Sequence, residues 1–261
     1  MYVIGERING MFKDVRQAIG ARDAAVIKDL AARQMAAGAD ALDVNVGPAA
    51  ADPKDAMEWL ITTIREVSDA PLAIDTTKPE VMALGLKLAG RGAILNSTTG
   101  DPAKLATFLP LAAEHQASVI SLTIDEKGIP RDGPARIEVA FRIVAAAMEA
   151  GIPTDKILID PVILPVKHTQ PTAGHVLEAL KDIRLLADPA PKTVLGLSNV
   201  SQGSIYRPLV NRTYLVMALT SGLDAAILDP MDTELMDAAI TAELLLNKCV
   251  YCDDFLKASR S

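Results

Sequence analysis

The sequence predicts an α/β fold, a (β/α)8 TIM barrel, and three observations lead to this prediction. Eight short apolar runs recur along the 261 residues, and segments with helical periodicity lie between them. Strands that alternate with helices form βαβ units and a parallel sheet, and eight such units fit a barrel of this length. Half of the residues are hydrophobic but only 3% are aromatic, which suits aliphatic strands covered by Ala-rich helices.

The predicted strands are short and evenly distributed along the chain. They span residues 2–5, 42–46, 72–75, 93–96, 119–124, 157–160, 194–198 and 225–229. A doubly wound open sheet is the rival architecture, but it usually has fewer strands and a glycine-rich nucleotide-binding turn. The sequence contains neither G-x-G-x-x-G nor G-x-x-x-x-G-K-[ST], and no linker or change of composition divides it. We therefore expect one barrel domain over residues 1–261.

Two of the segments between the strands carry clear helix signals. Residues 22–40 contain Gly38 near their end, and they present one apolar stripe, formed by Val26, Ile27, Leu30, Met35 and Ala39. Residues 134–152 open with Pro134 and close with Gly151, an asymmetry that is typical of helix ends.

Charge and hydropathy argue against several classes of partner. The formal net charge is −7 and no basic cluster is present, so we expect neither nucleic acid nor an anionic membrane as a partner. No stretch approaches the roughly 20 apolar residues that span a bilayer. The first ten residues, MYVIGERING, lack the basic and apolar regions of a signal peptide. These features favour a cytoplasmic location.

The two cysteines, Cys249 and Cys252, form a lone C-V-Y-C near the end of the sequence. With no second pair and no nearby histidine, a zinc site is poorly supported. The preceding residues, ELLLNKC, predict a helix that would place both thiols on one face. We interpret them as structural thiols in a reducing compartment, with redox or metal chemistry as the alternative.

Polar residues gather at the ends of the predicted strands. They are Asp43, Asn45, Asp75, Asn96, Asp160, Ser198, Asn199 and Asp229. In barrels of this kind the active site lies where the carboxyl ends of the strands converge. The alternative is that such residues cap helices or form turns, which explains Asp229 before Pro230 and Asp101 before Pro102. For Asp75, Asn96, Asp160 and Asn199 together we favour a functional site.

The common forms of nucleophilic catalysis are not indicated. The sequence has no G-x-S-x-G, no H-E-x-x-H and no cysteine near a strand end. None of the three histidines ends a predicted strand, so His115, His168 and His175 are interpreted as surface or packing residues.

A site rich in Asp and Asn suits a neutral heterocycle that presents several N–H donors. Asp carboxylates can accept paired hydrogen bonds from an amino-pyrimidinone edge, such as that of a pterin. An Asn side chain both donates and accepts, so it can stay bonded to a ring nitrogen whose protonation changes. A divalent metal held by Asp43, Asp75 and Asp160 is the weaker alternative, and we assign no metal ion to the site.

Six motifs together resemble the pterin-binding methyltransferases, and within them the methyltetrahydrofolate:corrinoid/iron–sulfur protein methyltransferases. The motifs are VIGERING (3–10), DVNVGP (43–48), LAIDTTKPEV (72–81), ILNSTTGD (94–101), ILIDPVILP (157–165) and LGLSNVSQG (195–203). The resemblance covers essentially the whole chain. IDTT is shared with dihydropteroate synthase, whereas GERIN with LSNVSQG is more specific and is shared with the folate domain of cobalamin-dependent methionine synthase.

The resemblance implies a reaction and a set of site residues. The enzyme would pass the methyl group of (6S)-5-methyltetrahydrofolate to the Co(I) of a corrinoid carried by a corrinoid/iron–sulfur protein, as in the acetyl-CoA pathway. Asn199 would hydrogen-bond N5 of the folate as the catalytic residue. The positions that would bind the pterin and the rest of the folate are Asp75, Asn96, Asp160, Gln202 and Arg207. The family also suggests a homodimer.

The corrinoid itself is expected to come from a protein partner. The D-x-H-x-x-G pattern that ligates cobalamin in dedicated domains is absent from the sequence. A partner that presents the cofactor must therefore dock transiently on the face of the barrel where the strands end.

Three other functions stay open from the sequence. Dihydropteroate synthase shares the fold, but that family has a lysine near strand seven and a basic segment at strand eight, where this chain has LSNVSQG and ILDPMD. A related methyltransferase could use another corrinoid protein or methylate tetrahydrofolate. The third alternative is a folate-binding protein without catalysis.

Overall fold

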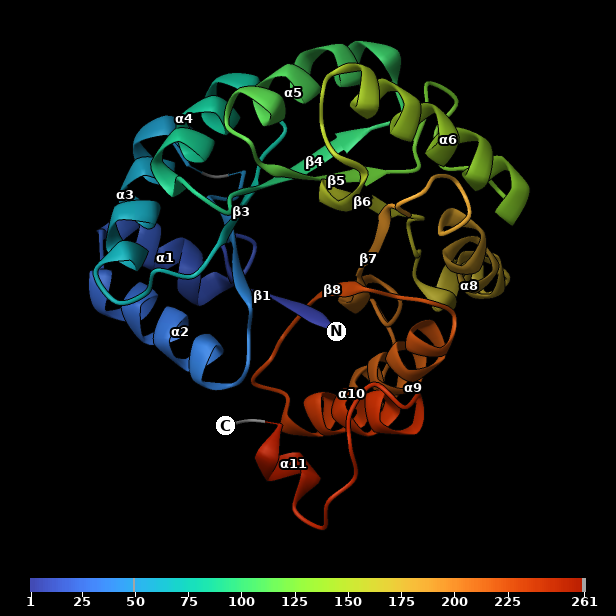
Figure 1. Ribbon diagram of the computed structural model, residues 1–261. Helices are drawn as coiled ribbons and strands as arrows, with labels where there is room; N and C mark the ends of the chain where they lie inside the picture. The colour runs from blue at the N-terminus through green and yellow to red at the C-terminus, as the bar shows by residue number, and fades with distance from the viewer. Residues whose placement is uncertain (49, 260–261) are drawn as a thin grey trace.

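Eight parallel strands form a closed barrel in the computed structural model, which describes residues 1–48 and 50–259. Each strand pairs with the next one along the chain, and the last, β8 (Ala225–Leu228), closes the barrel against the first, β1 (Tyr2–Asn9). Figure 1 shows the helices arranged in a ring around these strands. The predicted (β/α)8 TIM barrel is confirmed.

All eight predicted strands are present with small changes at their ends. The six strands between β1 and β8 are β2 (Ala41–Asn45), β3 (Leu72–Asp75), β4 (Ile94–Thr99), β5 (Ser118–Leu122), β6 (Ile157–Asp160) and β7 (Lys192–Gly196). β1 differs most from the prediction, because it continues to Asn9 through an irregularity. Its register against β2 shifts between Gly5 and Ile8, which a simple run of apolar residues does not indicate.

The helices lie outside the strands, and most of them follow a strand directly. They are α1 (Lys13–Ala21), α2 (Ala24–Ala36), α3 (Pro53–Arg65), α4 (Pro79–Ala89), α5 (Pro102–Glu114), α6 (Gly133–Glu149), α7 (Val166–Thr169), α8 (Thr172–Ile183), α9 (Arg207–Thr220), α10 (Thr233–Leu245) and α11 (Phe255–Ala258). Short 3-10 turns cover Thr154–Lys156 and Leu197–Asn199. None of the described helices is long and apolar enough to cross a membrane.

Aspartate side chains begin several of these helices. The N-cap carboxylates that accept backbone N–H bonds in the first turn are Asp23, Asp52, Asp101, Asp132 and Asp232. The interpretation of Asp101 as a cap is therefore confirmed. Asp229 forms a turn, as expected, because its carboxylate accepts the Met231 N–H at 3.0 Å.

The predicted helix boundaries need three corrections. The segment predicted as a helix over 22–40 is shorter, since α2 starts after the Asp23 cap and ends at Ala36. The nine-residue helix α1 was not predicted, because only three of its side chains are buried and its apolar stripe is short. The cysteines do not share a helix face: α10 ends at Leu245, and Asn247 follows with a left-handed φ of 59° that stops the helix before Cys249.

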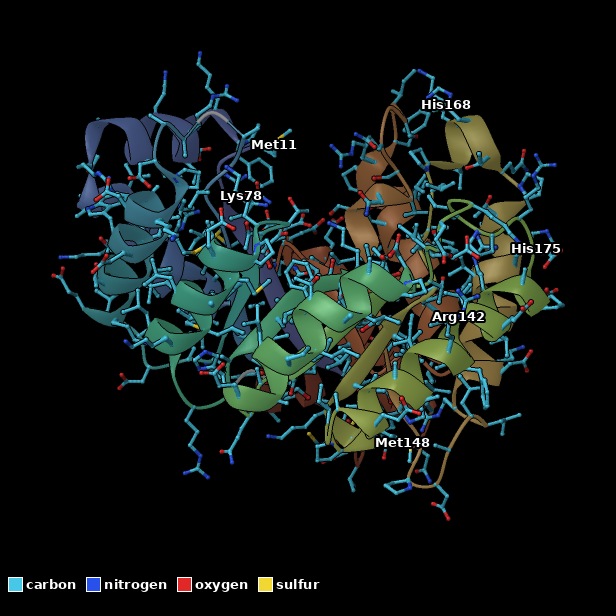
Figure 2. All side chains as sticks on the ribbon, turned by 90° about the horizontal axis from the view of Figure 1, so that it is seen from above. Met11, Lys78, Arg142, Met148, His168 and His175 are labelled. Atoms are coloured by element: carbon cyan, nitrogen blue, oxygen red, sulfur yellow. The ribbon has the colours of Figure 1, made fainter. Side chains whose placement is uncertain are left out.

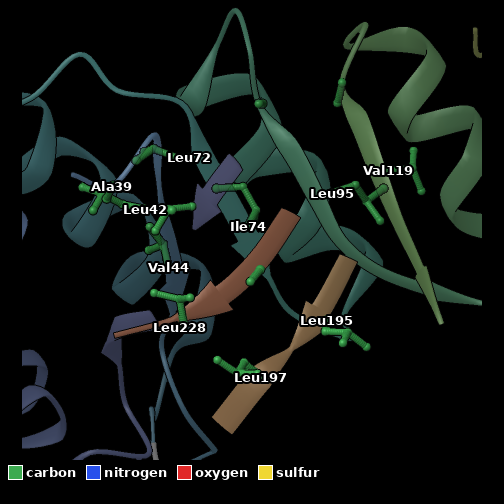
Figure 3. Packing of buried hydrophobic residues seen from close by; sticks show 14 of the residues in the cluster. Ala39, Leu42, Val44, Leu72, Ile74, Leu95, Val119, Leu195, Leu197 and Leu228 are labelled. Atoms are coloured by element: carbon green, nitrogen blue, oxygen red, sulfur yellow. The ribbon is translucent and has the colours of Figure 1, made fainter. Parts of the chain in front are cut away.

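Buried apolar side chains form two layers. The larger layer fills the space between strands and helices, and Figure 3 shows Leu42, Ile74, Leu95 and Leu195 within it. The smaller layer fills the barrel interior with one residue from each strand: Ile4, Ala41, Ala73, Ile94, Ile120, Leu158, Val194 and Ala225. Because strand side chains alternate, the residues two positions further on also point inward, one level closer to the carboxyl ends. At that level the interior becomes polar.

Candidate functional site

Five polar side chains occupy the level of the barrel interior above the apolar layer. They are Glu6, Asp43, Asp75, Asn96 and Asp160, each two residues beyond a member of that layer. Asp43, Asn96 and Asp160 are buried, with 2%, 8% and 7% of their surface exposed. The carboxyl ends of the strands face the upper edge of Figure 2, where Met11 and Lys78 lie on one side and His168 on the other. The structure thus brings Asp75, Asn96 and Asp160 together.

Two carboxylates in this cluster are held by amides from other strands. Asn45 Nδ2 donates to Asp75 Oδ2 at 2.6 Å, and Asn96 Nδ2 donates to Asp43 Oδ1 at 2.8 Å. Asn45 Oδ1 in turn accepts the Gly47 N–H at 2.6 Å, which fixes the orientation of its amide. The side chains of β2, β3 and β4 therefore form a connected polar wall.

Burial raises the pKa of both carboxyl groups in this wall. For Asp43 burial is the larger cause and the negative charge of Asp75 adds to it, while the hydrogen bond from Asn96 acts in the opposite direction. For Asp75 burial is again the larger cause, and the hydrogen bond from Asn45 opposes it. The two groups titrate together, because each ionised carboxylate disfavours a second one nearby.

Asp160 stands at the end of β6 and is held by backbone donors instead. Its Oδ1 accepts the Val162 N–H at 2.7 Å, and its Oδ2 accepts the Gly196 N–H at 3.3 Å. Burial raises the pKa of Asp160 to about 6, and these two hydrogen bonds limit the shift. The carboxyl group therefore changes its charge close to neutral pH.

The Asn199 amide lies over Gly196 at the end of β7, the residue whose backbone N–H donates to Asp160. A Cβ added at Gly196 would come within 3.0 Å of Asn199 Nδ2, so the glycine leaves the space that this amide occupies. Asn199 is exposed at the end of the 3-10 turn Leu197–Asn199. Among the described residues its amide has no hydrogen-bond partner, so it is available to a ligand.

Glu6 completes the ring of polar groups, although it was not predicted as a site residue. Ser198 Oγ donates to Glu6 Oε1 at 2.7 Å and connects β1 to the turn after β7. Burial raises the pKa of Glu6, with the Ser198 hydrogen bond opposing the shift. The buried Gln34 supports the irregular strand from outside, since its Oε1 accepts the Arg7 N–H at 2.9 Å. Glu6 lies two residues after the inward-facing Ile4, and this spacing was the signal in the sequence that could have identified it.

Gln202 and Arg207 lie in the same segment as Asn199. Both are exposed, and Arg207 is the first residue of α9. Arg207 Nε donates to Ser201 Oγ at 3.2 Å, and its Nη2 donates to the Ser198 carbonyl at 3.3 Å. The guanidinium thus braces the turn that carries Asn199 while it stays accessible from solvent.

The histidines stand apart from this cluster. His115 caps the C-terminus of α5, His168 is exposed on α7, and His175 on α8 lies 3.6 Å from Glu178. Within the described part of the chain, no group of three or more His, Cys, Asp or Glu side chains is placed to hold a metal ion.

Comparison with known proteins identifies full-length and partial relatives. A methylcorrinoid:tetrahydrofolate methyltransferase from Eubacterium limosum is 29% identical over 262 residues, covering 100% of this chain and 96% of that protein. A methionine synthase from Mycobacterium tuberculosis is 32% identical over 238 residues, which cover 86% of this chain but 20% of that protein. This chain therefore corresponds to about a fifth of the length of methionine synthase.

Solved structures show the same fold at low sequence identity. The dihydropteroate synthase of Yersinia pestis has a TM-score of 0.67 with 18% identity, covering 94% of this chain and 93% of the other. The enzyme from Xanthomonas albilineans in complex with 7,8-dihydropteroate has a TM-score of 0.65 with 18% identity, covering 96% and 94%. The family model of pterin binding enzymes matches residues 12–229. The chain belongs to the family of pterin-binding enzymes.

Proposed function

We propose that the protein is a methyltransferase that moves the N5 methyl group of (6S)-5-methyltetrahydrofolate to the Co(I) of a corrinoid carried by a partner protein. Membership in the pterin-binding family supports a folate as the small substrate. The relative that matches over nearly its full length is named for methyl transfer between a corrinoid and tetrahydrofolate, which supports the reaction. The observation that carries the proposal is the exposed Asn199 amide, which has no hydrogen-bond partner in the described part of the chain and lies at the edge of a buried ring of carboxylates and amides.

The proposed ligands of the pterin are Asp75, Asn96 and Asp160. A pterin presents an exocyclic amine and adjacent ring N–H groups, and carboxylates are strong acceptors for such paired donors. The cluster fits this group because Asp75 and Asp160 have no cationic partner among the described residues, so a ligand that donates hydrogen bonds lowers the cost of their burial. Gln202 and Arg207 would contact the rest of the folate, with Arg207 opposite the negative charge of its tail.

Asn199 is the proposed catalytic residue. An unprotonated tertiary amine is a very poor leaving group, so stabilising positive charge at N5 is the main requirement of the transfer. The Asn199 amide lies over Gly196, at the edge of the pterin cluster, and can accept from a protonated N5 or donate to a neutral one. The reduced corrinoid supplies the nucleophile. Clamping of the pterin by three side chains aligns the methyl group for attack.

The partner would dock around the carboxyl ends of the strands. Ile205 and Tyr206 lie in the segment that carries Asn199, and 91% and 71% of their surface is exposed. Exposed apolar side chains next to a site that needs a second protein suit a transient interface. We propose a corrinoid/iron–sulfur protein as this partner, as in the acetyl-CoA pathway, and a homodimer in a cytoplasmic setting. The sequence resemblance supports these three points.

The reverse direction is the second candidate. The full-length relative from Eubacterium limosum is named for transfer from a methylcorrinoid to tetrahydrofolate. The same residues would serve, because a group that stabilises protonated N5 as it leaves also positions N5 as it attacks. The direction in the cell would then follow from which corrinoid protein presents the cofactor.

The test follows methyl transfer spectroscopically with purified protein under anaerobic conditions. With (6S)-5-methyltetrahydrofolate and cob(I)alamin, we expect loss of the Co(I) absorption and formation of methylcobalamin. With tetrahydrofolate and methylcobalamin, the back reaction gives the equilibrium and the preferred direction. Binding of 5-methyltetrahydrofolate without transfer to free cobalamin or to any purified corrinoid protein would instead identify a folate-binding protein.

A further inference from the structure

Arg136 is a fully buried cation outside the ring of polar groups. It lies in the first turn of α6, and 1% of its surface is exposed, although arginine is almost never fully buried without a charged partner. No described carboxylate forms a salt bridge with its guanidinium, which donates to two backbone carbonyls. Burial lowers the pKa of Arg136, and the negative charge of Asp132 opposes this shift.

The position of this charge on its helix is also unfavourable. A cation near a helix N-terminus faces the positive end of the helix dipole, which is unfavourable. Removing the guanidinium from water costs further free energy, which only good hydrogen bonds offset. The hydrogen bonds to backbone carbonyls must therefore supply the free energy that keeps the Arg136 side chain buried.

One of these carbonyls belongs to the residue that follows Asp160. Arg136 Nε donates to the Pro161 carbonyl at 2.8 Å, and Nη1 donates to the Asp132 carbonyl at 3.0 Å. The peptide that carries the Pro161 carbonyl also carries the Val162 N–H. That N–H points at Asp160 Oδ1, at 2.7 Å. The two ends of one peptide unit are thus bonded to Arg136 on one side and to Asp160 on the other.

The same turn contains a strained residue. Val162 has a φ of 63°, in the left-handed region that β-branched residues rarely adopt. Such a conformation persists only where the surrounding contacts hold it in place. The described contacts that do so are the bond from Arg136 to the Pro161 carbonyl and the bond from Val162 to the Asp160 carboxylate.

We propose that Arg136 is a positioning residue for the substrate site: it fixes the peptide between Pro161 and Val162, and through it the orientation of the Asp160 carboxylate. Tyr214 on α9 is the other titratable group that interacts electrostatically with both Asp160 and Arg136. Its hydroxyl donates to the Ala173 carbonyl at 2.9 Å, so it leaves the Pro161 carbonyl to Arg136. The consequence for folate binding rests on the proposed function, whereas the consequence for the Asp160 carboxyl group does not.

The experiment measures the titration midpoint of the Asp160 carboxyl group and the affinity for the folate in one set of variants. Arg136→Met keeps the aliphatic stem but removes the donors, and Arg136→Lys keeps one charged donor. Arg142→Met is the matched control, because Arg142 lies on the same helix and contacts Asp125 and Glu126 instead. Arg142, labelled in Figure 2, also donates to the Gly100 carbonyl at 3.5 Å, and no hydrogen bond or ion pair joins it to the described residues 160–162.

We expect the titration midpoint of Asp160, followed by carbon NMR, to rise in Arg136→Met because the Val162 N–H is no longer held on its oxygen. The dissociation constant for 5-methyltetrahydrofolate should increase about tenfold, the loss of one hydrogen bond to a charged group, while kcat at saturation changes little. Arg136→Lys should fall between wild type and Arg136→Met. Arg142→Met should match wild type in both measurements.

A double variant separates positioning from a general role in stability. Val162→Gly removes the strain, because glycine adopts a positive φ without penalty. In the Val162→Gly background the turn no longer depends on Arg136 to overcome that strain, so Arg136→Met should cost clearly less folate affinity than it does alone. A purely structural arginine would give the same loss in both backgrounds.

The outcomes distinguish this inference from the proposed function. An unchanged Asp160 midpoint in folded Arg136→Met, or in Arg136→Lys if the methionine variant does not fold, overturns the inference. Failure of the wild-type protein to bind 5-methyltetrahydrofolate overturns the proposed function. A raised Asp160 midpoint in the variant would still support the role of Arg136 in that case.

Discussion

The two sides of the barrel mouth hold their polar groups in different ways. On the side of β2, β3 and β4, amide side chains bond the carboxylates, as in the contacts of Asn45 with Asp75 and of Asn96 with Asp43. On the side of β6 and β7, backbone N–H groups hold Asp160, and the Asn199 amide has no described partner. The first side is pre-arranged before a ligand arrives, whereas the second offers groups whose bonding can change. We therefore expect the carboxylates, including Asp160, to determine the affinity for the folate, and the Asn199 amide to determine the rate of transfer.

The largest effect is expected from Asn199→Ala. Loss of one preorganised hydrogen-bonding group at a centre that changes charge costs about 10²–10³ in rate in other enzymes. The rate constant of methyl transfer at saturating folate should fall by that factor, while the dissociation constant of the folate changes only a few-fold. Stopped-flow absorbance of cob(I)alamin gives the rate, and calorimetry gives the affinity. A variant with wild-type turnover would remove Asn199 from the mechanism.

Asp75→Asn should show the opposite division between affinity and rate. The substitution keeps the shape but removes the charge, and hydrogen bonds to charged groups contribute about 1.5–3 kcal/mol, so the dissociation constant should increase about 10- to 100-fold. The rate constant at saturation should stay within a few-fold of wild type. Asp52→Asn, at an exposed helix cap where Asn serves equally well, is the control. A loss of rate without a loss of affinity would break the comparison between the two sides.

The raised pKa of Asp160 predicts how both binding and stability depend on pH. Folate binding should weaken as pH falls through about 6, because the protonated carboxyl group no longer accepts paired hydrogen bonds. This acid limb should be absent in Asp160→Asn. Calorimetric titrations between pH 5 and 8 would show both, and the same limb in the variant would assign it to another group.

The stability of the fold should depend on pH in the opposite way to folate binding, and decrease as pH rises. The pKa of Asp160 is raised from 3.8 to about 6, so between these values the folded state binds more protons than the unfolded state and stability falls as pH rises. This rise in the pKa of Asp160 corresponds to roughly 3 kcal/mol. Between pH 4 and pH 7 the unfolding free energy of wild type should therefore fall by about this amount relative to that of Asp160→Asn. Urea unfolding at the two pH values measures it, and a constant difference would contradict the assignment.

The smallest effect is expected at the proposed docking surface. Ile205→Glu should increase KM for a corrinoid protein several-fold and leave the reaction with free cob(I)alamin unchanged, because only the protein partner contacts this side chain. Leu185→Glu, at a position with 81% of its surface exposed after α8 on the opposite face of the barrel, is the control. Equal effects of the two substitutions would place the partner elsewhere.

The sequence predicts the barrel and the inward positions well, because both depend on local periodicity. The period of two along each strand places Asp75, Asn96 and Asp160 above the apolar layer without knowledge of any contact. The bond from Asn96 to Asp43 could not be predicted in this way, since it depends on the relative register of strands far apart in the sequence. Glu6 was missed for a related reason, because the irregular part of β1 hides the alternation.

Contacts between layers are the least accessible to prediction. In the sequence Arg136 has the pattern of a polar residue on the exposed face of an amphipathic helix. Only the packing of α6 against the turn after β6 shows that it is buried. The left-handed backbone at Val162 has no local signal either, since neither glycine nor asparagine stands there. Such features depend on tertiary structure that the chain forms as a whole.

The most direct test of the central claim is a single-turnover experiment with both substrates. Wild type and Asn199→Ala are each saturated with (6S)-5-methyltetrahydrofolate, mixed rapidly with cob(I)alamin, and followed by absorbance. We predict rapid formation of methylcobalamin by wild type and a rate about 10²–10³ lower for the variant at equal folate occupancy. Equal rates for the two proteins, or no methyl transfer by folate-saturated wild type to free or protein-bound corrinoid, would contradict it.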